Sequence, residues 1–279
     1  MTRFRLDLGY DGTDFHGWAA QTGLRTVQGT MRDAIDRALA DFGLPPTLGL
    51  VAAGRTDTGV HARGQVAHFD AEIPPDRVTE FKRRVVSLLP EDIALHSMAP
   101  APPDFDARFA AAGRTYCYRI WDAMSLPFVP LRRAVTTLPV ALDVDAMAAA
   151  ADTLLGLRDF AAFCRPREGG TTIRQLRRFD VRRLDDPCRT IECWLEADAF
   201  CHSMVRSIVG AVVTVGSGRR DLAWLALAAA SDRRANDVPT LPPGGLTLED
   251  VAYPPDDQLA RRVAEARNHR ILDDPEPAQ

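Results

Sequence analysis

Apolar positions in the N-terminal part of the chain repeat with two periods, which predicts alternating strands and helices. Residues 3–12 alternate apolar with polar side chains and end in an Asp-Gly pair, which is typical of a half-buried strand followed by a turn. Residues 26–43 carry apolar side chains at helical spacing, with Thr26 as the expected N-cap and Gly43 as the expected C-cap. Strands are also expected at 48–55, 64–73 and 92–100, and a helix at 78–89.

A similar order of elements recurs after the proline-bearing stretch Pro100–Phe105, which we interpret as a linker. The pattern therefore predicts an α/β (α+β) protein of two lobes, each a mostly antiparallel sheet with helices on one face. Expected boundaries are 1–104 for the N-terminal lobe, 105–253 for the C-terminal lobe and 254–279 for an acidic, partly disordered tail. In the second lobe, strands are predicted at 114–123, 177–185 and 189–200, and helices at 143–156, 202–216 and 222–231.

Composition narrows the classes of function. Hydrophobic residues make up 46% and charged residues 26%, which is ordinary for a globular protein. The N-terminus has no apolar signal-peptide core and no apolar run is long enough to cross a membrane, so no membrane role is expected. Five cysteines without a C-x-x-C pair disfavour a zinc site and a disulfide framework, and favour the cytoplasm. No metal or other cofactor is expected.

Charge gives a mixed indication about nucleic acids. The net charge of −4 argues weakly against a phosphate-rich partner. However, Lys82 is the single lysine among 34 basic residues, and arginine binds phosphate bidentately and stacks on bases. Each local arginine cluster is typical of a solvated face, but several together indicate a shared phosphate-binding surface. These clusters lie at 82–84, 131–133, 164–168 and 174–183.

The stretch GRTDTGVH, residues 54–61, holds one carboxylate, Asp57, between two glycines. Taken alone, such an aspartate is most often a turn residue that bonds nearby backbone amides. The functional alternative is a carboxylate presented by a strand-to-strand connection, kept ionised by Arg55 and able to attack carbon. The lysine and Ser/Thr of a phosphate-binding P-loop are missing, which disfavours nucleotide hydrolysis. For His61 we favour a structural role.

Aromatic residues offer a second candidate feature. Tyr116 and Tyr118 share one face of a predicted strand, because side chains alternate with a period of two. Two core tyrosines are the simpler interpretation, and a platform on which a base stacks is the functional one. The cluster of Phe15, His16 and Trp18 is a weak signal by itself.

Five blocks of sequence, in order along the chain, together resemble the tRNA pseudouridine synthase A family. The most specific is AGRTDTGVHARGQVAHF at 53–69, which resembles the active-site motif of that family. The others are LGYDGTDFHGWAAQ with RTVQG near the N-terminus, FDARFAAAGRTYCYRI at 105–120, FCHSMVRSIVGAVVTVG at 200–216 and PPGGLTLEDVAY at 242–253.

The resemblance implies a reaction and roles for particular residues. It implies an isomerase that converts uridine to pseudouridine at positions 38, 39 and 40 of the tRNA anticodon stem-loop, without a cofactor. It further implies ferredoxin-like (RRM-like) lobes, a basic cleft between them and a homodimer. Asp57 matches the catalytic aspartate, and attack at C1′ and addition at uracil C6 both stay open. The remaining matches are Arg55 as the aspartate's partner and place-holder for the base, Tyr116 as the stacking tyrosine, Leu246 as a pocket residue, and His202 and Arg206 near the cleft.

An alternative from a different class is a tRNA-binding protein or chaperone that kept the fold without catalysis. Asp57 discriminates between the two, since a pure binder gains nothing from a carboxylate that faces phosphates. Departures from the family pattern, such as VVSLLP at 85–90 and Thr171 in place of arginine, lie away from Asp57 and concern substrate choice.

Overall fold

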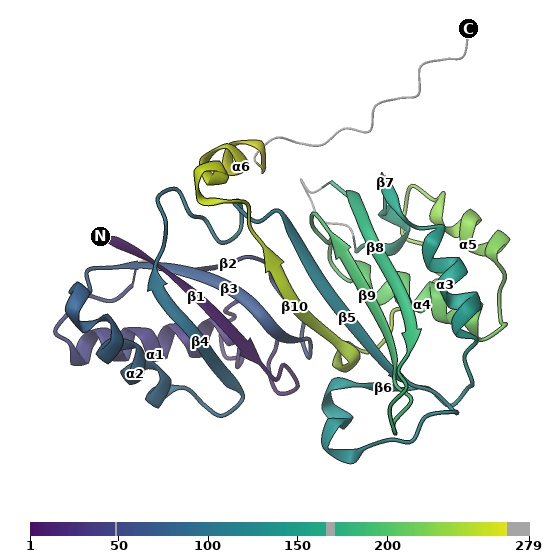
Figure 1. Cartoon of the computed structure of the whole chain (residues 1–279), viewed down its shortest axis with the longest axis horizontal. Coiled ribbons are helices and arrows are strands. Elements are labelled where there is room, and N and C mark those ends of the chain that lie inside the picture. The colour runs from purple at the N-terminus through teal and green to yellow at the C-terminus, as the bar shows by residue number, and fades with distance from the viewer. Residues whose placement is uncertain (48, 166–170, 267–279) are drawn as a thin grey trace, which may run out of the picture. The chain divides into compact units, whose positions relative to one another are not determined.

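The computed structural model describes residues 1–47, 49–165 and 171–266, and the chain forms two compact units. Unit 1 comprises Met1–Cys117, Val129–Thr136 and Pro243–Ala266, and unit 2 comprises Tyr118–Phe128 and the described part of Thr137–Pro242. The fold is mixed α/β with mostly antiparallel strands, as predicted (Figure 1).

In unit 1 the strands follow the order β4-β1-β3-β10-β5. Pairing of β3 with β1 and β2 is antiparallel, as is that of β1 with β4, whereas β10 runs parallel to β3. The elements are β1 (Thr2–Tyr10), α1 (Val27–Asp41), β2 (Leu50–Ala52), β3 (His61–Ala71), α2 (Val78–Leu88), β4 (Ile93–Pro100), β5 (Gly113–Trp121, of which Gly113–Cys117 belong to unit 1), β10 (Leu246–Ala252) and α6 (Leu259–Ala266).

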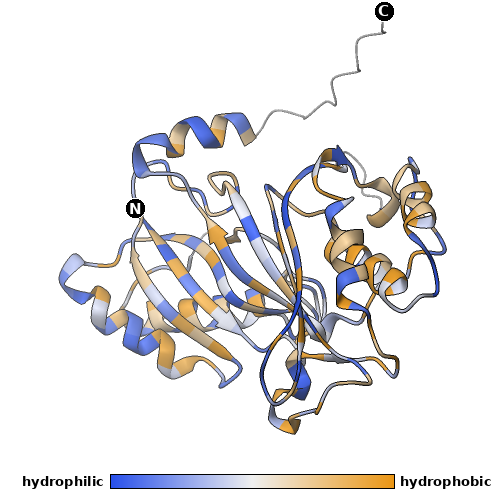
Figure 2. Cartoon of the chain, turned by 45° about the vertical axis from the view of Figure 1, so that its right-hand side comes forward, coloured by the Kyte–Doolittle hydropathy of each residue, from blue (hydrophilic) through white to orange (hydrophobic). Residues whose placement is uncertain are grey.

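Local sequence explains why these elements form. Along β1 the apolar side chains Phe4, Leu6 and Leu8 are buried, and the stripes of hydropathy along the strands are visible in Figure 2. The N-cap prediction for α1 is confirmed, because Thr26 Oγ1 accepts a hydrogen bond from the Gly29 N–H at 3.3 Å. Burial of the apolar face of α1 removes hydrocarbon from water, which is the main stabilising contribution in such a core.

Unit 1 extends beyond the boundary at residue 104 that the sequence predicted for the N-terminal lobe. The stretch Pro100–Phe105 lies within unit 1, where the Phe105 ring is buried and stands 5.1 Å from the Tyr253 ring. The unit extends through Cys117 and gains β10 from beyond residue 242, so its bounds differ from a break at residue 104. Strand β10 is far from β3 in sequence, and single-chain periodicity gives no indication of such long-range pairing. Within the expected tail α6 is formed, and residues 267–279 lie outside the described residues.

In unit 2 the strands follow the order β5-β9-β8-β7, where Tyr118–Trp121 are the part of β5 that belongs to this unit. The predicted antiparallel pair is confirmed, with Phe179 of β8 opposite Leu195 of β9. Asp143 caps α3 by accepting from the Ala146 N–H at 3.0 Å. The elements are α3 (Val144–Asp152), β7 (Gly156–Asp159), β8 (Ile173–Arg183), β9 (Ile191–Ala197), α4 (Met204–Gly216) and α5 (Leu222–Ala229). The short strand β6 (Thr136–Thr137) has its first residue in unit 1 and its second in unit 2.

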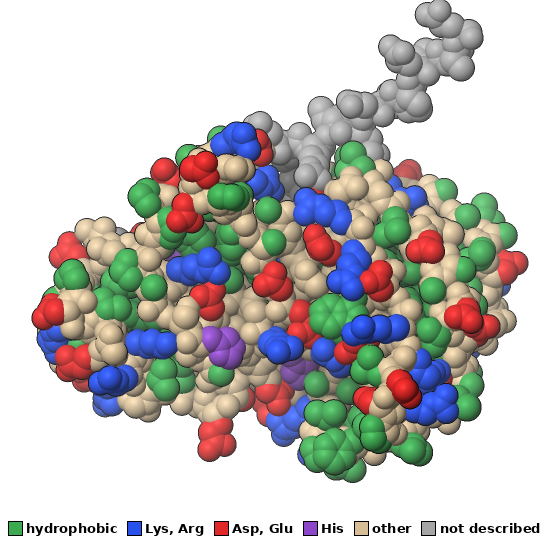
Figure 3. Space-filling view, in the orientation of Figure 1, with side chains coloured by type: hydrophobic (Ala, Val, Ile, Leu, Met, Phe, Trp, Pro, Cys, Tyr) green, Lys and Arg blue, Asp and Glu red, His purple; other side chains and the backbone are tan. Residues whose placement is uncertain are grey.

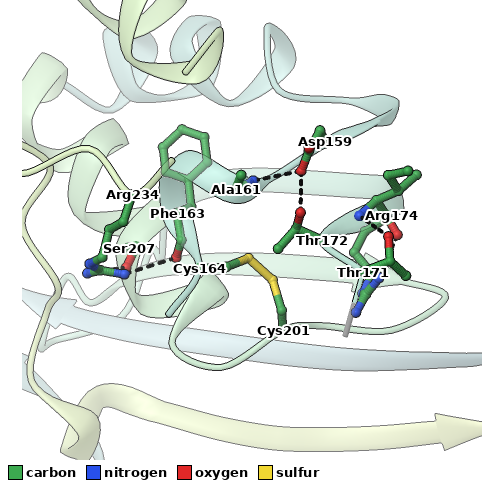
Figure 4. The surroundings of a disulfide bond; sticks show 11 residues. Asp159, Ala161, Phe163, Cys164, Thr171, Thr172, Arg174, Cys201, Ser207 and Arg234 are labelled. Atoms are coloured by element: carbon green, nitrogen blue, oxygen red, sulfur yellow. Dashed lines mark hydrogen bonds between the residues drawn. A yellow bond between two sulfur atoms is a disulfide. The ribbon is translucent and has the colours of Figure 1, made fainter. Parts of the chain in front are cut away.

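Unit 2 contains a cysteine pair that the sequence analysis did not anticipate. Cys164 and Cys201 form a disulfide with their Cα atoms 5.8 Å apart (Figure 4). Beside it the Arg165 N–H donates to the His202 carbonyl at 3.0 Å, which joins the two segments that carry the sulfurs. The expectation of no disulfide is therefore corrected, because the fold brings together cysteines that are 37 residues apart.

Across the three described ranges, no helix combines the length and the apolar character that crossing a membrane would require.

Candidate active site

Residues 53–60 connect β2 to β3, as the sequence predicted, and carry Asp57. The β2–β3 ladder runs up to Ala53, whose N–H donates to the Val66 carbonyl at 2.8 Å. A turn then closes where the Val60 N–H donates to the Asp57 carbonyl at 3.1 Å, and Gly59 takes a left-handed φ of 77°. Asp57 is half-buried on this turn, and Arg55 is exposed two residues before it.

Residues 11–18, which we name the clamp segment, hold this loop from the N-terminal side. The Trp18 N–H donates to the Thr56 carbonyl at 3.0 Å, and the Gly59 N–H donates to the Phe15 carbonyl at 3.2 Å. Gly17 has a φ of 83°, and a Cβ there would stand 2.8 Å from the Thr56 carbonyl oxygen. The clamp segment therefore approaches the loop backbone on both sides of Asp57, closely enough that Gly17 cannot carry a side chain.

His61 joins the same two segments. Its Nδ1 accepts a hydrogen bond from the Gly12 N–H at 3.0 Å and lies 3.2 Å from Asp11 Oδ1, and this acceptor role leaves Nε2 as the N–H of the ring. The Nε2–H then donates to the Arg133 carbonyl at 2.8 Å. Because His61 is buried and both ring nitrogens bind backbone groups, its geometry supports the structural role that the sequence favoured.

A buried polar network lies under the N-terminal side of the loop. Tyr10 Oη and Thr56 Oγ1 are 2.8 Å apart, and Gln65 Nε2 is 3.3 Å from Tyr10 Oη. Gln65 Nε2 also donates to the Gly54 carbonyl at 2.9 Å. Burial raises the pKa of Tyr10 to about 12, so its phenol stays protonated at neutral pH.

Tyr116 on β5 is buried in unit 1. Burial first, and then the nearby Tyr10 and Asp57, raise the pKa of Tyr116 above its usual value. The Tyr116 phenol is consequently a neutral hydrogen-bonding group beside the Asp57 carboxylate. Tyr118, by contrast, is fully buried in unit 2 and donates to the Pro242 carbonyl at 2.7 Å, which agrees with the core interpretation.

Leu246 begins β10 and lies at the end of the loop. The parallel pairing sets Thr247 opposite His61, so the preceding Leu246 is buried next to the last loop residues. Just before it, Pro243 is so close to Gly59 that a Cβ on Gly59 would stand 2.8 Å from Pro243 Cγ. An apolar wall thus lies along the C-terminal side of the turn that carries Asp57.

His202 and Arg206 belong to unit 2, so their placement relative to Asp57 stays a prediction. His202 is exposed, and Arg206 donates to the Leu241 carbonyl and to Ser203 Oγ, each at 3.2 Å. Burial first, and then the charges of Arg165 and Arg206, lower the pKa of Arg234. These three arginines form a local cationic group within unit 2.

The cluster at 174–183 fits the simpler interpretation of a solvated face. Four of its arginines form ion pairs with carboxylates of unit 2, which neutralises much of the charge that phosphate would need. The pairs are Arg177 with Glu196, Arg178 with Asp180, Arg182 with Glu192 and Arg183 with Asp122. The expected cluster at 164–168 lies mostly outside the described residues.

The structure brings Asp57, Arg55, Tyr116 and Leu246 into one unit, and adds residues that the sequence analysis did not single out. Tyr10, Thr56 and Gln65 are the buried polar groups next to the loop. Arg114 also contributes, since its Nη2 donates to the Ala53 carbonyl at 2.7 Å where the loop begins. Gln65 could have been noticed in the sequence, because a glutamine interrupts an otherwise apolar strand pattern there. Tyr10, Thr56 and Arg114 could be found only from their long-range contacts in the structure.

Comparison with known proteins gives matches over nearly the whole chain. A family model described as tRNA pseudouridine synthase matches residues 150–254. A Cutibacterium acnes protein named tRNA pseudouridine synthase A is 51% identical over 276 residues, which cover 98% of this chain and 97% of that protein. A protein of the same name from Frankia casuarinae is 51% identical over 97% of this chain and 96% of its own length. Another from Bifidobacterium longum is 44% identical over 98% of this chain and 100% of its own length.

Similarity to solved structures is weak. A crystal structure of a Cbf5-Nop10-Gar1 complex matches with 12% identity and a TM-score of 0.29, over 75% of this chain and 54% of that chain. An H/ACA RNP bound to a substrate RNA containing 2'-deoxyuridine matches with 10% identity and a TM-score of 0.30, over 76% and 53%. Scores this low do not bear on the geometry of the site.

We predict that Gly17→Ala destabilises the protein more than Gly23→Ala. Both glycines have a left-handed φ, so each substitution costs about 1 kcal/mol of unfolding free energy. Gly17→Ala adds a collision with the Thr56 carbonyl, worth roughly a further 1–3 kcal/mol, whereas the space around Gly23 is open. Denaturant unfolding of both variants measures the difference, and equal losses would contradict a tight contact between clamp segment and loop.

Proposed function

The chain belongs to the tRNA pseudouridine synthase A family, and we propose that it isomerises uridine to pseudouridine in the anticodon stem-loop of tRNA, at positions 38, 39 and 40. The observation that carries the assignment of the site is the loop of Asp57, which is bound on both sides and presents one half-buried carboxylate. Full-length relatives support the reaction, and the geometry of unit 1 supports the residues.

The reaction exchanges one bond to the ribose for another. The C1′–N1 glycosidic bond breaks, the uracil turns, and C5 forms a bond with C1′. The hydrogen on C5 then leaves as a proton, and N1 gains a proton, so atoms and charge balance. In our proposal Asp57 is the nucleophile, since one ionised carboxylate can take up C1′ while the base is detached or add to uracil C6.

Tyr116 and Leu246 have complementary roles in this proposal. A target base in a stem must leave its stack, which costs a few kcal/mol. Stacking on the Tyr116 ring offsets part of that cost, and the neutral phenol introduces no charge that would repel the Asp57 carboxylate. Leu246 contributes apolar surface that excludes water from the detached fragment. Arg55, exposed on the loop, pairs with Asp57 until the uridine displaces it.

RNA binding rests on arginine. In unit 2 the group formed by Arg165, Arg206 and Arg234 places three guanidinium groups near one another, and such groups suit phosphate oxygens. We assign His202, on the same segment as Arg206, to this RNA-binding surface of unit 2. The tRNA substrate also favours a cytoplasmic location for the protein.

We further propose that the protein is a homodimer. The loop that joins β5 to β6 presents five large apolar side chains that are half or more exposed, and a patch of this kind is typical of an interaction site. Figure 3 shows hydrophobic side chains gathered over this loop in the lower part of the view. The five are Met124, Leu126, Phe128, Val129 and Leu131.

For catalysis we predict that Asp57→Asn abolishes turnover while tRNA still binds. The amide keeps the shape of the side chain but cannot act as the nucleophile, and loss of such a group costs roughly 10³-fold or more in rate. Tritium release from tRNA labelled at uridine C5 measures the reaction. Asp41→Asn, which removes an exposed carboxylate of the same unit that is paired with Arg84, is the matched control and should keep the wild-type rate.

Two results would contradict the proposal. Tritium release by Asp57→Asn at the wild-type rate would remove the nucleophile, and no release by the wild type would favour a tRNA-binding chaperone instead. Transcripts in which cytidine replaces uridine at positions 38, 39 and 40 test the target site. The proposal predicts that these transcripts release no tritium, and unchanged release would place the modified uridine elsewhere.

For assembly we predict that Leu126→Ser with Phe128→Ser converts the dimer to monomer. Both side chains are more than half exposed, so their replacement removes apolar area from a dimer interface without opening a core. Sedimentation velocity reports the mass. Leu227→Ser, at an exposed leucine of α5, is the control and should stay dimeric. A wild-type protein that sediments as monomer at micromolar concentration would exclude the homodimer.

A further inference from the structure

Three polar side chains of unit 1 form a chain of hydrogen bonds that ends on the residue before Asp57. Tyr10, Thr56 and Gln65 are all nearly inaccessible to solvent, with exposed fractions of 5%, 6% and 0%. Tyr10 comes from the end of β1, Gln65 from β3 and Thr56 from the loop itself. The network therefore ties the loop to the paired strands β1 and β3.

The orientation of the Gln65 amide sets the direction of the hydrogen bonds that this side chain forms. Its Oε1 accepts from the Val66 N–H at 3.2 Å, and its Nε2 faces the Gly54 carbonyl at 2.9 Å. The opposite amide orientation would set two oxygens against each other, so Nε2 is the donor to both Gly54 and Tyr10. Tyr10 Oη thus accepts from Gln65, and it shares a further hydrogen bond of 2.8 Å with Thr56 Oγ1, in which either hydroxyl can be the donor.

The network holds two loop residues on the N-terminal side of Asp57. Gly54 is held through its carbonyl and Thr56 through its hydroxyl, while the clamp segment holds the Thr56 carbonyl through Trp18. Thr56 is thus bound both by its backbone and by its side chain. With these bonds in place, rotation of the backbone at Thr56, which would swing the Asp57 carboxylate, breaks at least one buried hydrogen bond.

We propose that Tyr10, Gln65 and Thr56 are positioning residues that aim the Asp57 carboxylate at the reacting uridine, an inference that rests on the proposed function of Asp57. Buried polar groups cost free energy unless all their bonds are made, and apolar side chains of similar volume would stabilise a core as well or better. A satisfied network at this one place therefore contributes direction rather than stability. Catalysis rewards such direction, because a misplacement of about 1 Å can cost roughly a hundredfold in rate.

The test is a double-mutant cycle on the rate of a single turnover. Tyr10→Phe and Thr56→Val each remove one hydroxyl of the bond between these two residues, with little change in side-chain shape. We expect each variant to lower the single-turnover rate about tenfold with the dissociation constant for tRNA within about twofold of wild type. The double variant should be no slower than the slower single variant, because the bond between Tyr10 and Thr56 is lost in all three and Tyr10→Phe already removes the acceptor for Gln65 as well.

Two further variants separate positioning from stability. Thr56→Ser keeps the hydroxyl and should restore a rate close to wild type. Tyr253→Phe removes a half-buried phenol of unit 1, which donates to the Ala107 carbonyl at 2.6 Å, and should leave the rate unchanged. Thermal midpoints of all variants are measured in parallel, so that a variant that fails to fold is recognised. In that case the rate of Thr56→Ser is compared with that of the wild type instead.

The outcomes distinguish this inference from the proposed function. If Asp57→Asn is inactive but Tyr10→Phe and Thr56→Val turn over at the wild-type rate, the positioning role is wrong and the proposed function stands. Multiplicative losses in the double variant, or weakened tRNA binding with an unchanged rate, would also overturn it. If Asp57→Asn is fully active, the assignment of Asp57 as the nucleophile fails and this inference fails with it, whereas the proposed reaction itself fails only if the wild type releases no tritium.

Discussion

The site depends on the contact between the clamp segment, residues 11–18, and the loop that carries Asp57. Backbone hydrogen bonds from Trp18 to Thr56 and from Gly59 to Phe15 fasten the loop on both sides of the carboxylate. Buried backbone groups that lose such partners are costly, so the loop has little freedom to leave this position. The close approach at Gly17 adds a steric constraint, because the segments meet at a distance that leaves no room for a Cβ.

The chemistry we propose follows from this constraint. A carboxylate that reacts with carbon must be held at the right distance and angle before the substrate arrives, since ordering it during the reaction would raise the barrier. The clamp segment fixes the loop through backbone hydrogen bonds. The side-chain hydrogen bonds from Gln65 to Tyr10 and from Tyr10 to Thr56 fix it a second time. Leu246 and Pro243 cover the C-terminal side with apolar surface. The result is one polar reactive group on a rigid turn with a neutral phenol nearby.

Much of this could be predicted from the sequence, because local rules apply to its elements. Three local patterns were sufficient to predict elements of unit 1, and the structure confirms those elements. They are the alternation along residues 3–12, the helical spacing after Thr26 and the position of GRTDTGVH between two strands. What local patterns could not provide was pairing between distant segments. The parallel contact of β10 with β3 moved residues beyond 242 into the first unit. The Cys164–Cys201 disulfide was missed for the same reason.

The candidate site divides in the same way. Asp57 and Arg55 lie two residues apart in one short motif, which could be recognised from the sequence alone. His61 was harder, since a histidine in a motif suggests chemistry until both ring nitrogens are seen to bind backbone. Tyr10 looks like an ordinary inward residue of an alternating strand, and only the fold shows its hydroxyl against Thr56. Buried polar networks of this kind are set by three-dimensional contacts, which no periodicity reports.

Amide hydrogen exchange of the free protein tests the central claim, which is that the loop is fixed before tRNA binds. The amides of Trp18 and Gly59 form the two backbone bonds between clamp segment and loop. The account predicts that both exchange as slowly as the β3 amides that pair with β1, and that adding tRNA does not slow them further. Exchange as fast as that of an exposed turn, with protection appearing only when tRNA is added, would show that the substrate orders the loop and would contradict the account.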